Sequence, residues 1–204
     1  MRQTIKSIWV LIFLLLFSNK LSASDFMKND SLKVAEIVNE FYEWYITAIK
    51  EKNYSEFGPK FIENKNGMTT LEFSTYLKNL KTKAFSDSLI LKEKQSYQVC
   101  IRNLEKVKYS DFQKTSFTDL DEFEQAHCDF GNYYRWIGGQ EPIDGIRIKK
   151  TTFQSTDLVI VKIDYFEYSK EKNEKYFWGE NRLTLKKLRN HWFIYRIDSW
   201  KNID

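Results

Sequence analysis

The strongest constraint in this sequence is a change in the spacing of its apolar residues near Pro142. Before this point, apolar residues recur at three- and four-residue steps, which is typical of amphipathic helices. After it they alternate, and Val159, Val161, Ile163 and Tyr165 are separated by single residues, as in strands with one buried face. Helices grouped ahead of strands predict an α+β fold, with the helices packed on one face of an antiparallel sheet.

Four strands are expected in the C-terminal part. The pattern predicts them at Gly145 to Phe153, around Val159 to Phe166, at Tyr176 to Leu188 and at His191 to Trp200. Turn residues separate them, with Lys170 to Asn173 before the third strand and Arg189-Asn190 before the fourth. Because short turns join consecutive strands, we expect a four-stranded antiparallel meander.

The clearest helix is expected over Ser31 to Glu51, capped by Asp30 or Ser31. Its apolar residues form a stripe, and Tyr42, Trp44 and Ile46 lie off that stripe. A helix that is apolar over more than half its surface is usually covered by a sheet or a second layer. We therefore expect this helix to lie under the meander.

Two further helices are predicted before the strands. Thr69-Thr70-Leu71-Glu72 matches a capping box, which would open a second helix. A third helix is expected to follow Ser86-Asp87 and to end before Tyr109. The stretch from Ser110 to Ile143 has no sustained period, and a loop of this length is often functional.

The N-terminus has the order of a secretory signal peptide. Arg2 and Lys6 precede ten apolar residues, Ile8 to Phe17, and cleavage is expected after Ala23. A helix that spans a bilayer needs about 20 apolar residues, so this run is too short to stay in the membrane. We expect residues 1–23 to be removed, leaving a single domain over residues 24–204 that is periplasmic or secreted, from a Gram-negative bacterium.

Composition and charge exclude several classes of protein. A chain of 204 residues with 42% hydrophobic and 17% aromatic residues is too apolar to be disordered. The net charge of +4 falls to +1 after cleavage, because residues 1–23 hold three of the 32 basic residues and none of the 28 acidic ones. This near-neutral charge argues against a nucleic-acid or membrane partner.

The two cysteines, Cys100 and Cys128, have two interpretations. In an oxidising compartment they would form a disulfide, which closes a loop and stabilises the fold by roughly 3 to 4 kcal/mol. Alternatively they are two buried thiols. Together with His127 and His191 they do not match a zinc signature, so we expect no metal and no cofactor.

Candidate site residues fall in the stretch without a period. His127 lies between Glu124 and Asp129, where a carboxylate could orient the imidazole of a general base. This part of the chain is acidic, and we take Asp121 and Glu124 as candidate contacts for a partner. A second group of candidates consists of residues of the types enriched in binding hot spots, Tyr133, Tyr134, Arg135 and Trp136. The alternative is that these aromatic side chains cover the open end of the sheet.

The order of elements resembles a known superfamily. A long aromatic helix with Phe41-Tyr42-Glu43-Trp44-Tyr45, shorter helices, and a sheet that ends in Tyr195-Arg196-Ile197-Asp198-Ser199-Trp200 resembles the nuclear transport factor 2-like, or cystatin-like, superfamily. The run from Asp119 to Asp129 is similar to an exported bacterial branch of it, the domain of unknown function 3828 family. The resemblance implies a cone of helices against a curved sheet, and it implies no reaction.

These observations favour an exported, non-enzymatic binding protein. Its partner would be a protein or a small apolar ligand, and a specific version is an immunity or inhibitor protein that docks the acidic stretch on a basic enzyme. The alternative is a small cavity enzyme of the isomerase or dehydratase type, with His127 or a buried Asp as general base. A phosphate-binding glycine motif is absent from the sequence, since Gly138-Gly139 has no following Lys and Ser or Thr.

Overall fold

A computed structural model describes residues 28–114, 128, 136–137 and 143–198. The chain divides into two compact units, residues 1–36 and residues 37–204, which are described separately. Within the first unit, the described residues form the beginning of a helix that continues to residue 50. The expected signal peptide, residues 1–23, lies outside the described residues.

The long N-terminal helix spans residues 28–50, which confirms the helix expected at Ser31 to Glu51. The prediction of its cap is wrong, because Asp30 and Ser31 lie inside the helix. A polar residue marks a helix start only when the residues before it are not helical, and here residues 28 and 29 already are. Tyr42 and Ile46, which lie off the apolar stripe, are both buried, as expected for a helix covered on more than one side.

The segment after this helix forms a short helix and a small hairpin. Helix α2 (Tyr54–Phe57) precedes strands β1 (Lys60–Glu63) and β2 (Thr69–Glu72), which pair in antiparallel register. The capping box expected at Thr69 is therefore wrong. The turn at Gly67, whose φ of 76° suits glycine, folds the β-branched Thr69 and Thr70 back onto β1. Helix α3 (Ser74–Thr82) starts later, and the Glu72 side chain accepts a hydrogen bond from the Ser74 backbone N–H.

Two helices occupy the range where the sequence predicted one, and a third short helix begins at Tyr109, after the predicted end. They are α4 (Asp87–Ser96), α5 (Gln98–Leu104) and α6 (Tyr109–Phe112). The hydroxyl of Ser86 accepts a hydrogen bond from the Leu89 N–H at 3.2 Å, which confirms the expected start. The break falls at Tyr97, whose ring packs on Phe73 and Tyr76 with centroids 5.6 and 6.4 Å apart, so packing interrupts the helical pattern.

The C-terminal part is the expected four-stranded antiparallel meander. Its strands, paired in the order β3-β4-β5-β6, are β3 (Gly145–Phe153), β4 (Leu158–Ser169), β5 (Glu174–Leu188) and β6 (His191–Asp198). Arg189 and Asn190 both have positive φ, as a tight hairpin turn requires. At Gly179, which also has positive φ, the pairing of β4 with β5 shifts register, and such a bulge increases the local twist.

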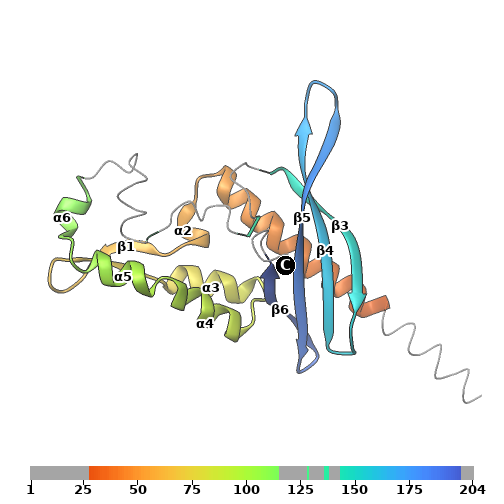
Figure 1. The fold of residues 1–204 in the computed structure, drawn as a ribbon, viewed down its shortest axis with the longest axis horizontal. Coiled ribbons are helices and arrows are strands. Elements are labelled where there is room, and N and C mark those ends of the chain that lie inside the picture. Colours follow the sequence, from red (N-terminus) through yellow and green to blue (C-terminus); the bar gives the residue numbers. More distant parts are fainter. Residues whose placement is uncertain (1–27, 115–127, 129–135, 138–142, 199–204) are drawn as a thin grey trace, which may run out of the picture. The chain divides into compact units, whose positions relative to one another are not determined.

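The core of the second unit lies between one face of this sheet and the helices. The ring of Tyr42, on the part of the long helix that belongs to this unit, lies 6.1 Å from that of Tyr165 on β4, so this part of the helix packs on the sheet (Figure 1). The turn between α3 and α4 is connected to β6 by main-chain hydrogen bonds on both sides of Phe85, which link Ser86 and Ala84 to Ile194. The inward residues of the sheet are almost completely buried, namely Val159, Val161, Ile163, Tyr165, Leu183, Leu185 and Ile194.

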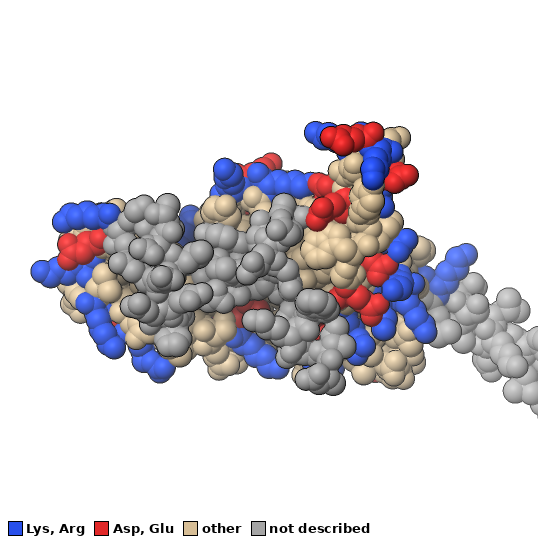
Figure 2. Space-filling model, turned by 45° about the horizontal axis from the view of Figure 1, so that its top comes forward, with Lys and Arg blue, Asp and Glu red and all other residues tan. Residues whose placement is uncertain are grey.

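Charged side chains of both signs lie on the described part of the surface that Figure 2 shows. In Figure 2, basic and acidic groups lie interspersed on the visible face, including the projecting end of the β4–β5 hairpin. On the sheet they form a connected ladder, in which Asp164 contacts Arg147 at 2.6 Å and Lys149 at 3.3 Å. Glu180 continues the ladder with contacts of 3.1 Å to Lys149 and Lys162.

Candidate functional site

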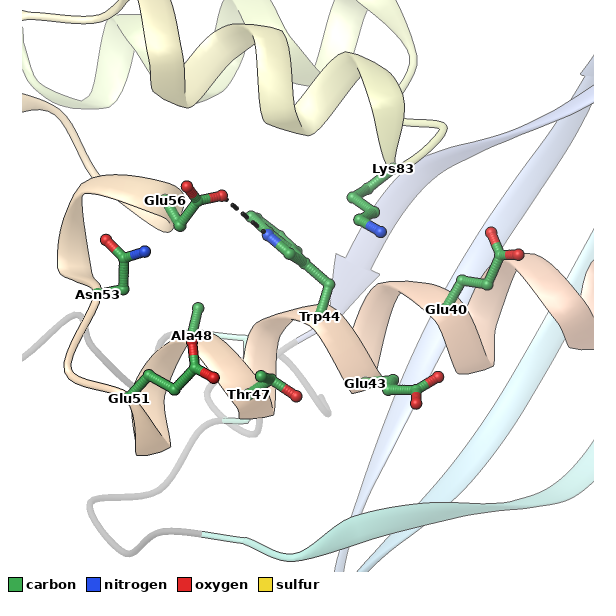
Figure 3. A pocket seen from close by; sticks show the side chains of 9 residues that line it. All are labelled: Glu40, Glu43, Trp44, Thr47, Ala48, Glu51, Asn53, Glu56 and Lys83. Carbon is green, nitrogen blue, oxygen red and sulfur yellow. Dashed lines mark hydrogen bonds between the residues drawn. The ribbon is translucent and has the colours of Figure 1, made fainter.

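An acidic cleft of about 600 Å³ lies between the long helix and the α2–α3 region. Figure 3 shows its lining side chains, which come from the helix, from the turn into α2, from α2 itself and from the end of α3. They are Glu40, Glu43, Trp44, Thr47, Ala48, Glu51, Asn53, Glu56 and Lys83. We refer to this feature as the acidic cleft. All of these residues belong to the second unit.

Helical periodicity explains why the carboxylates gather there. Glu40, Glu43 and Thr47 follow one another at steps of three and four residues, so they lie along one face of the helix, and Glu51 follows directly after its end. That face points away from the buried stripe, and all four residues are exposed. Trp44 lies next to this row and is only partly buried. One stretch of helix therefore presents a line of charge beside an aromatic ring.

Trp44 is held in a defined orientation. Its indole nitrogen donates to Glu56 Oε2 at 3.4 Å, and the side-chain amide of Asn79 donates to the same oxygen at 2.7 Å. Behind it, the rings of Phe41 and Trp136 lie 6.2 and 6.3 Å away. Figure 3 shows Trp44 rising from the helix between Glu56 and Lys83. A ring fixed in this way is ready for contact with a ligand, because little side-chain entropy is lost on binding.

The charge of the acidic cleft is strongly unbalanced. Four glutamates line it against one ammonium group, that of Lys83. Among the described residues, Glu40, Glu43 and Glu51 have no ion pair. Like charges held close together in a concave site concentrate a negative potential, which attracts cations. An indole face adds cation–π attraction of about 0.5 to 2 kcal/mol to such a ligand.

A second cluster of polar groups lies in the core, around the main-chain carbonyl of Trp136. This oxygen accepts hydrogen bonds from the hydroxyls of Tyr42 and Tyr165, both at 3.1 Å, and from Asn181 Nδ2 at 2.9 Å. Asn181 Nδ2 also donates to the hydroxyl of Tyr165 at 2.7 Å. Burial raises the pKa of both Tyr42 and Tyr165 above the ordinary value, so both hydroxyls stay protonated and can donate. The cluster fixes Trp136 to the helix and the sheet.

The position of Trp136 differs from the expectation of a surface contact. Only 4% of this residue is exposed, and its ring packs against Tyr45, Phe41 and Phe85 at centroid distances of 4.8, 5.4 and 5.6 Å. Filling the core buries more apolar area than one face of a surface patch would, so tertiary packing decides its place. The other candidate binding residues lie outside the described residues; they are Asp121, Glu124, Tyr133, Tyr134 and Arg135.

The expected disulfide between Cys100 and Cys128 is confirmed, and both residues are buried. His127, the weak candidate for a general base, lies outside the described residues. His191, at the start of β6, is exposed, and its Nδ1 lies 2.9 Å from the main-chain oxygen of Arg189. In the part of the chain that the structure describes, no three or more His, Cys, Asp or Glu side chains gather as metal ligands would.

The two buried Asp residues of the sheet are both held in ion pairs. Asp164 is buried, but hydrogen bonds from Arg147 hold the pKa of its carboxyl below the ordinary value. Asp198 is also buried and pairs with Arg196. A carboxylate whose pKa is lowered in this way takes up a proton less readily, so Asp164 is not suited to proton abstraction.

Sequence reasoning missed the acidic cleft, although part of its signal was present. The glutamates at 40, 43 and 51 have helical spacing, and Trp44 lies off the apolar stripe. The opposite wall could not be predicted, because Glu56 and Lys83 reach the cleft only through the turns around α2 and α3.

No helix in the described ranges combines the length and the apolar character that crossing a membrane requires. A scan against models of known protein families found no match, and searches of curated proteins and of solved structures likewise found none.

Proposed function

We propose that this chain is an exported, non-enzymatic binding protein whose ligand carries positive charge and binds in the acidic cleft. The observation that carries the proposal is the set of carboxylates that make no ion pair with other described residues, beside the fixed ring of Trp44. A volume of about 600 Å³ lies in the range of small-molecule sites. The charge of the lining favours a cationic ligand over the apolar one that the sequence suggested.

Two kinds of ligand meet this description. A short aliphatic diamine places an ammonium at each end and can span two of the glutamates, which succeed one another along the helix. A lysine or arginine side chain of a protein partner presents the same group from a larger surface. The second form corresponds to the immunity or inhibitor protein considered from the sequence, with the acidic cleft in place of the acidic run from Asp119 to Asp129 as the contact.

We also propose that the fold is a variant of the nuclear transport factor 2-like cone and that the chain belongs to the exported domain of unknown function 3828 family. The packing of a long aromatic helix against a four-stranded antiparallel meander supports this proposal. The cysteine pair is bonded, and oxidising compartments favour disulfides, which supports export. A cavity enzyme that uses a buried Asp receives no support from Asp164, because that residue is ion-paired.

The test is calorimetric titration of the purified chain with 1,4-diaminobutane, with succinate as an anionic control of similar length. We expect binding of the diamine and none of succinate, with an affinity that falls as salt rises. Trp44→Ala should weaken binding by about 3- to 30-fold, the equivalent of one cation–π contact. Glu43→Gln should also weaken it, whereas Glu167→Gln, on the exposed end of β4, should have no effect.

A separate experiment tests the protein-partner form. Wild-type and Glu40→Gln/Glu43→Gln/Glu51→Gln chains are used as baits in the same extract, with Glu167→Gln as control. A partner lost only from the triple variant would support that form. If the chain binds neither the diamine nor any partner in a way that depends on these glutamates, the proposed function is wrong.

A further inference from the structure

The acidic cleft also contains a cation, the ammonium group of Lys83. Among the described residues, Lys83 makes no ion pair, and neither do Glu40, Glu43 and Glu51 of the same lining. Charges of opposite sign therefore line one space of about 600 Å³ without pairing with each other. A ligand that lies between them could pair with both.

The backbone holds Lys83 at this place. Its N–H donates to the carbonyl of Asn79 at 2.9 Å, in the last turn of α3. The next residue, Ala84, has a φ of 59°, which ends the helix, and its carbonyl accepts from the Ile194 N–H at 2.7 Å. Figure 3 shows the Lys83 side chain extending from the end of α3 toward the long helix. Pairing with β6 thus fixes the end of α3 from which this cation reaches the cleft.

The two walls of the cleft differ in the charge that they offer to a ligand. Oε2 of Glu56 already accepts hydrogen bonds from Trp44 and Asn79, so the glutamates left for a ligand are those of the long helix and of the residue after its end. The opposite wall offers the ammonium group of Lys83, and the indole of Trp44 stands between the two. A ligand with ammonium groups alone leaves Lys83 unpaired and is repelled by it. A ligand with carboxylates alone is repelled by the glutamates.

We propose that Lys83 makes the acidic cleft selective for basic amino acids. The α-carboxylate of the ligand pairs with Lys83, its side-chain ammonium pairs with glutamates of the long helix, and its methylene groups lie against the indole of Trp44. This inference rests on the proposed function, because it names the class of ligand for the same cleft. A free amino acid and the C-terminal residue of a peptide both carry this pair of charges.

The experiment compares L-lysine with 1,5-diaminopentane by calorimetric titration of the full chain. These two compounds differ only in the carboxylate, and the diamine carries the larger positive charge. A cleft that responds to net charge alone binds the diamine more tightly. We expect the reverse order, with L-lysine bound about 10-fold more tightly, because a charged hydrogen bond to Lys83 is added. Glycyl-lysine tests the peptide source, and its binding would show that a C-terminal lysine suffices.

Variants of Lys83 test whether this residue causes the preference. Lys83→Gln should weaken the binding of L-lysine by about 10-fold and should not weaken that of the diamine. Lys83→Arg keeps the positive charge and should keep the preference, which also controls for a general effect of substitution at this position. Lys78→Gln changes an exposed lysine of α3 that does not line the cleft, and it should leave both affinities unchanged.

The outcomes separate this inference from the proposed function. If the wild type binds the diamine as tightly as L-lysine or more tightly, the inference is wrong and the proposed function stands. A preference for L-lysine that persists in Lys83→Gln would also overturn the inference. If neither compound nor glycyl-lysine binds in a way that Glu43→Gln weakens, the proposed small-molecule site fails, and the inference fails with it.

Discussion

The meander and the α4–α5 region differ sharply in how their apolar residues are used. In the meander, Val161 and Ile163 on β4 and Leu183 on β5 have no exposed surface. In α4, no residue is fully buried, and Leu91 is 55% exposed. Both regions contain apolar residues at regular spacing. Only in the sheet do these residues form a continuous buried face.

The difference shows what stabilises each region. Strands β4 and β5 pair over twelve positions and bury a whole row of side chains, so hydrophobic burial holds them directly. Helices α4 and α5 are short, and isolated helices of this length are marginal in water. They depend on particular attachments, which include the Ser86 cap, the Glu93 carboxyl and the disulfide at Cys100.

The largest expected effect tests the buried face of the sheet. Val161→Asp places an unpaired charge where no surface is exposed, and we expect it to prevent folding, at a cost of more than about 4 kcal/mol. Leu91→Asp on α4 should change the free energy of unfolding by less than about 1 kcal/mol. Circular dichroism and thermal unfolding of both variants measure the contrast. Equal melting temperatures for Val161→Asp and the wild type would contradict it.

An intermediate effect is expected from the disulfide. Replacing both cysteines, as Cys100→Ser/Cys128→Ser, should lower the free energy of unfolding by roughly 3 to 4 kcal/mol, because the unfolded chain is no longer closed into a loop. Urea unfolding gives the size of the loss, with reduced wild-type protein as the comparison. Amide hydrogen exchange shows where in the chain stability is lost, and we expect the exchange rate to increase more in α5 than in β4 and β5. A uniform increase along the chain would show that the helices do not depend on this bond more than the sheet does.

The smallest effect concerns the charged ladder on the sheet. Hydrogen bonds from Lys162 and then Lys149 lower the pKa of Glu180. Its stabilising contribution is therefore present above the ordinary pKa of 4.5 and is lost as the pH falls through the lowered value in the folded protein. Glu180→Gln should cost less than about 1 kcal/mol at neutral pH and less still at high salt.

Urea unfolding at pH 7 and pH 3.5 measures this contribution. The wild type should lose more stability on acidification than Glu180→Gln does. Glu167→Gln, an exposed glutamate on the same strand pair, serves as control and should behave as the wild type. An identical acid response in Glu180→Gln would mean that the ladder does not stabilise the sheet.

Much of the fold was predictable where the spacing of residues determines burial. Strand β3 begins and ends at the predicted residues, and Arg189-Asn190 forms the predicted turn, because both signals are local. The predicted start of the second helix at Thr69 is wrong for a physical reason, although the helix itself forms from Ser74. A capping pattern states which conformation a segment favours alone, whereas pairing with β1 gives Thr69–Glu72 a different one. The division of the third helix at Tyr97 likewise depends on contacts with distant rings.

The candidate site was less predictable than the fold. Its residues come from the long helix, from α2 and the turn before it, and from Lys83, and only the helical part has a local signal. Trp136 was selected from its residue type as a surface contact, but it lies in the core. Residue type indicates how much a side chain can contribute to a contact. It does not indicate whether that contact lies in the core or at the surface.

The sequence by itself determined the α+β class, the order of the four strands, the long helix and the pairing partner available to each cysteine. These features follow from the periodicity of residues that are close in the sequence and from the composition of the chain. Only the tertiary structure decided that Trp136 fills the core, that Glu93 accepts a hydrogen bond from Tyr76, and that four glutamates line one cleft together with Trp44. The reason is that burial and charge balance depend on which distant segments meet, and that depends on the packing of the whole unit.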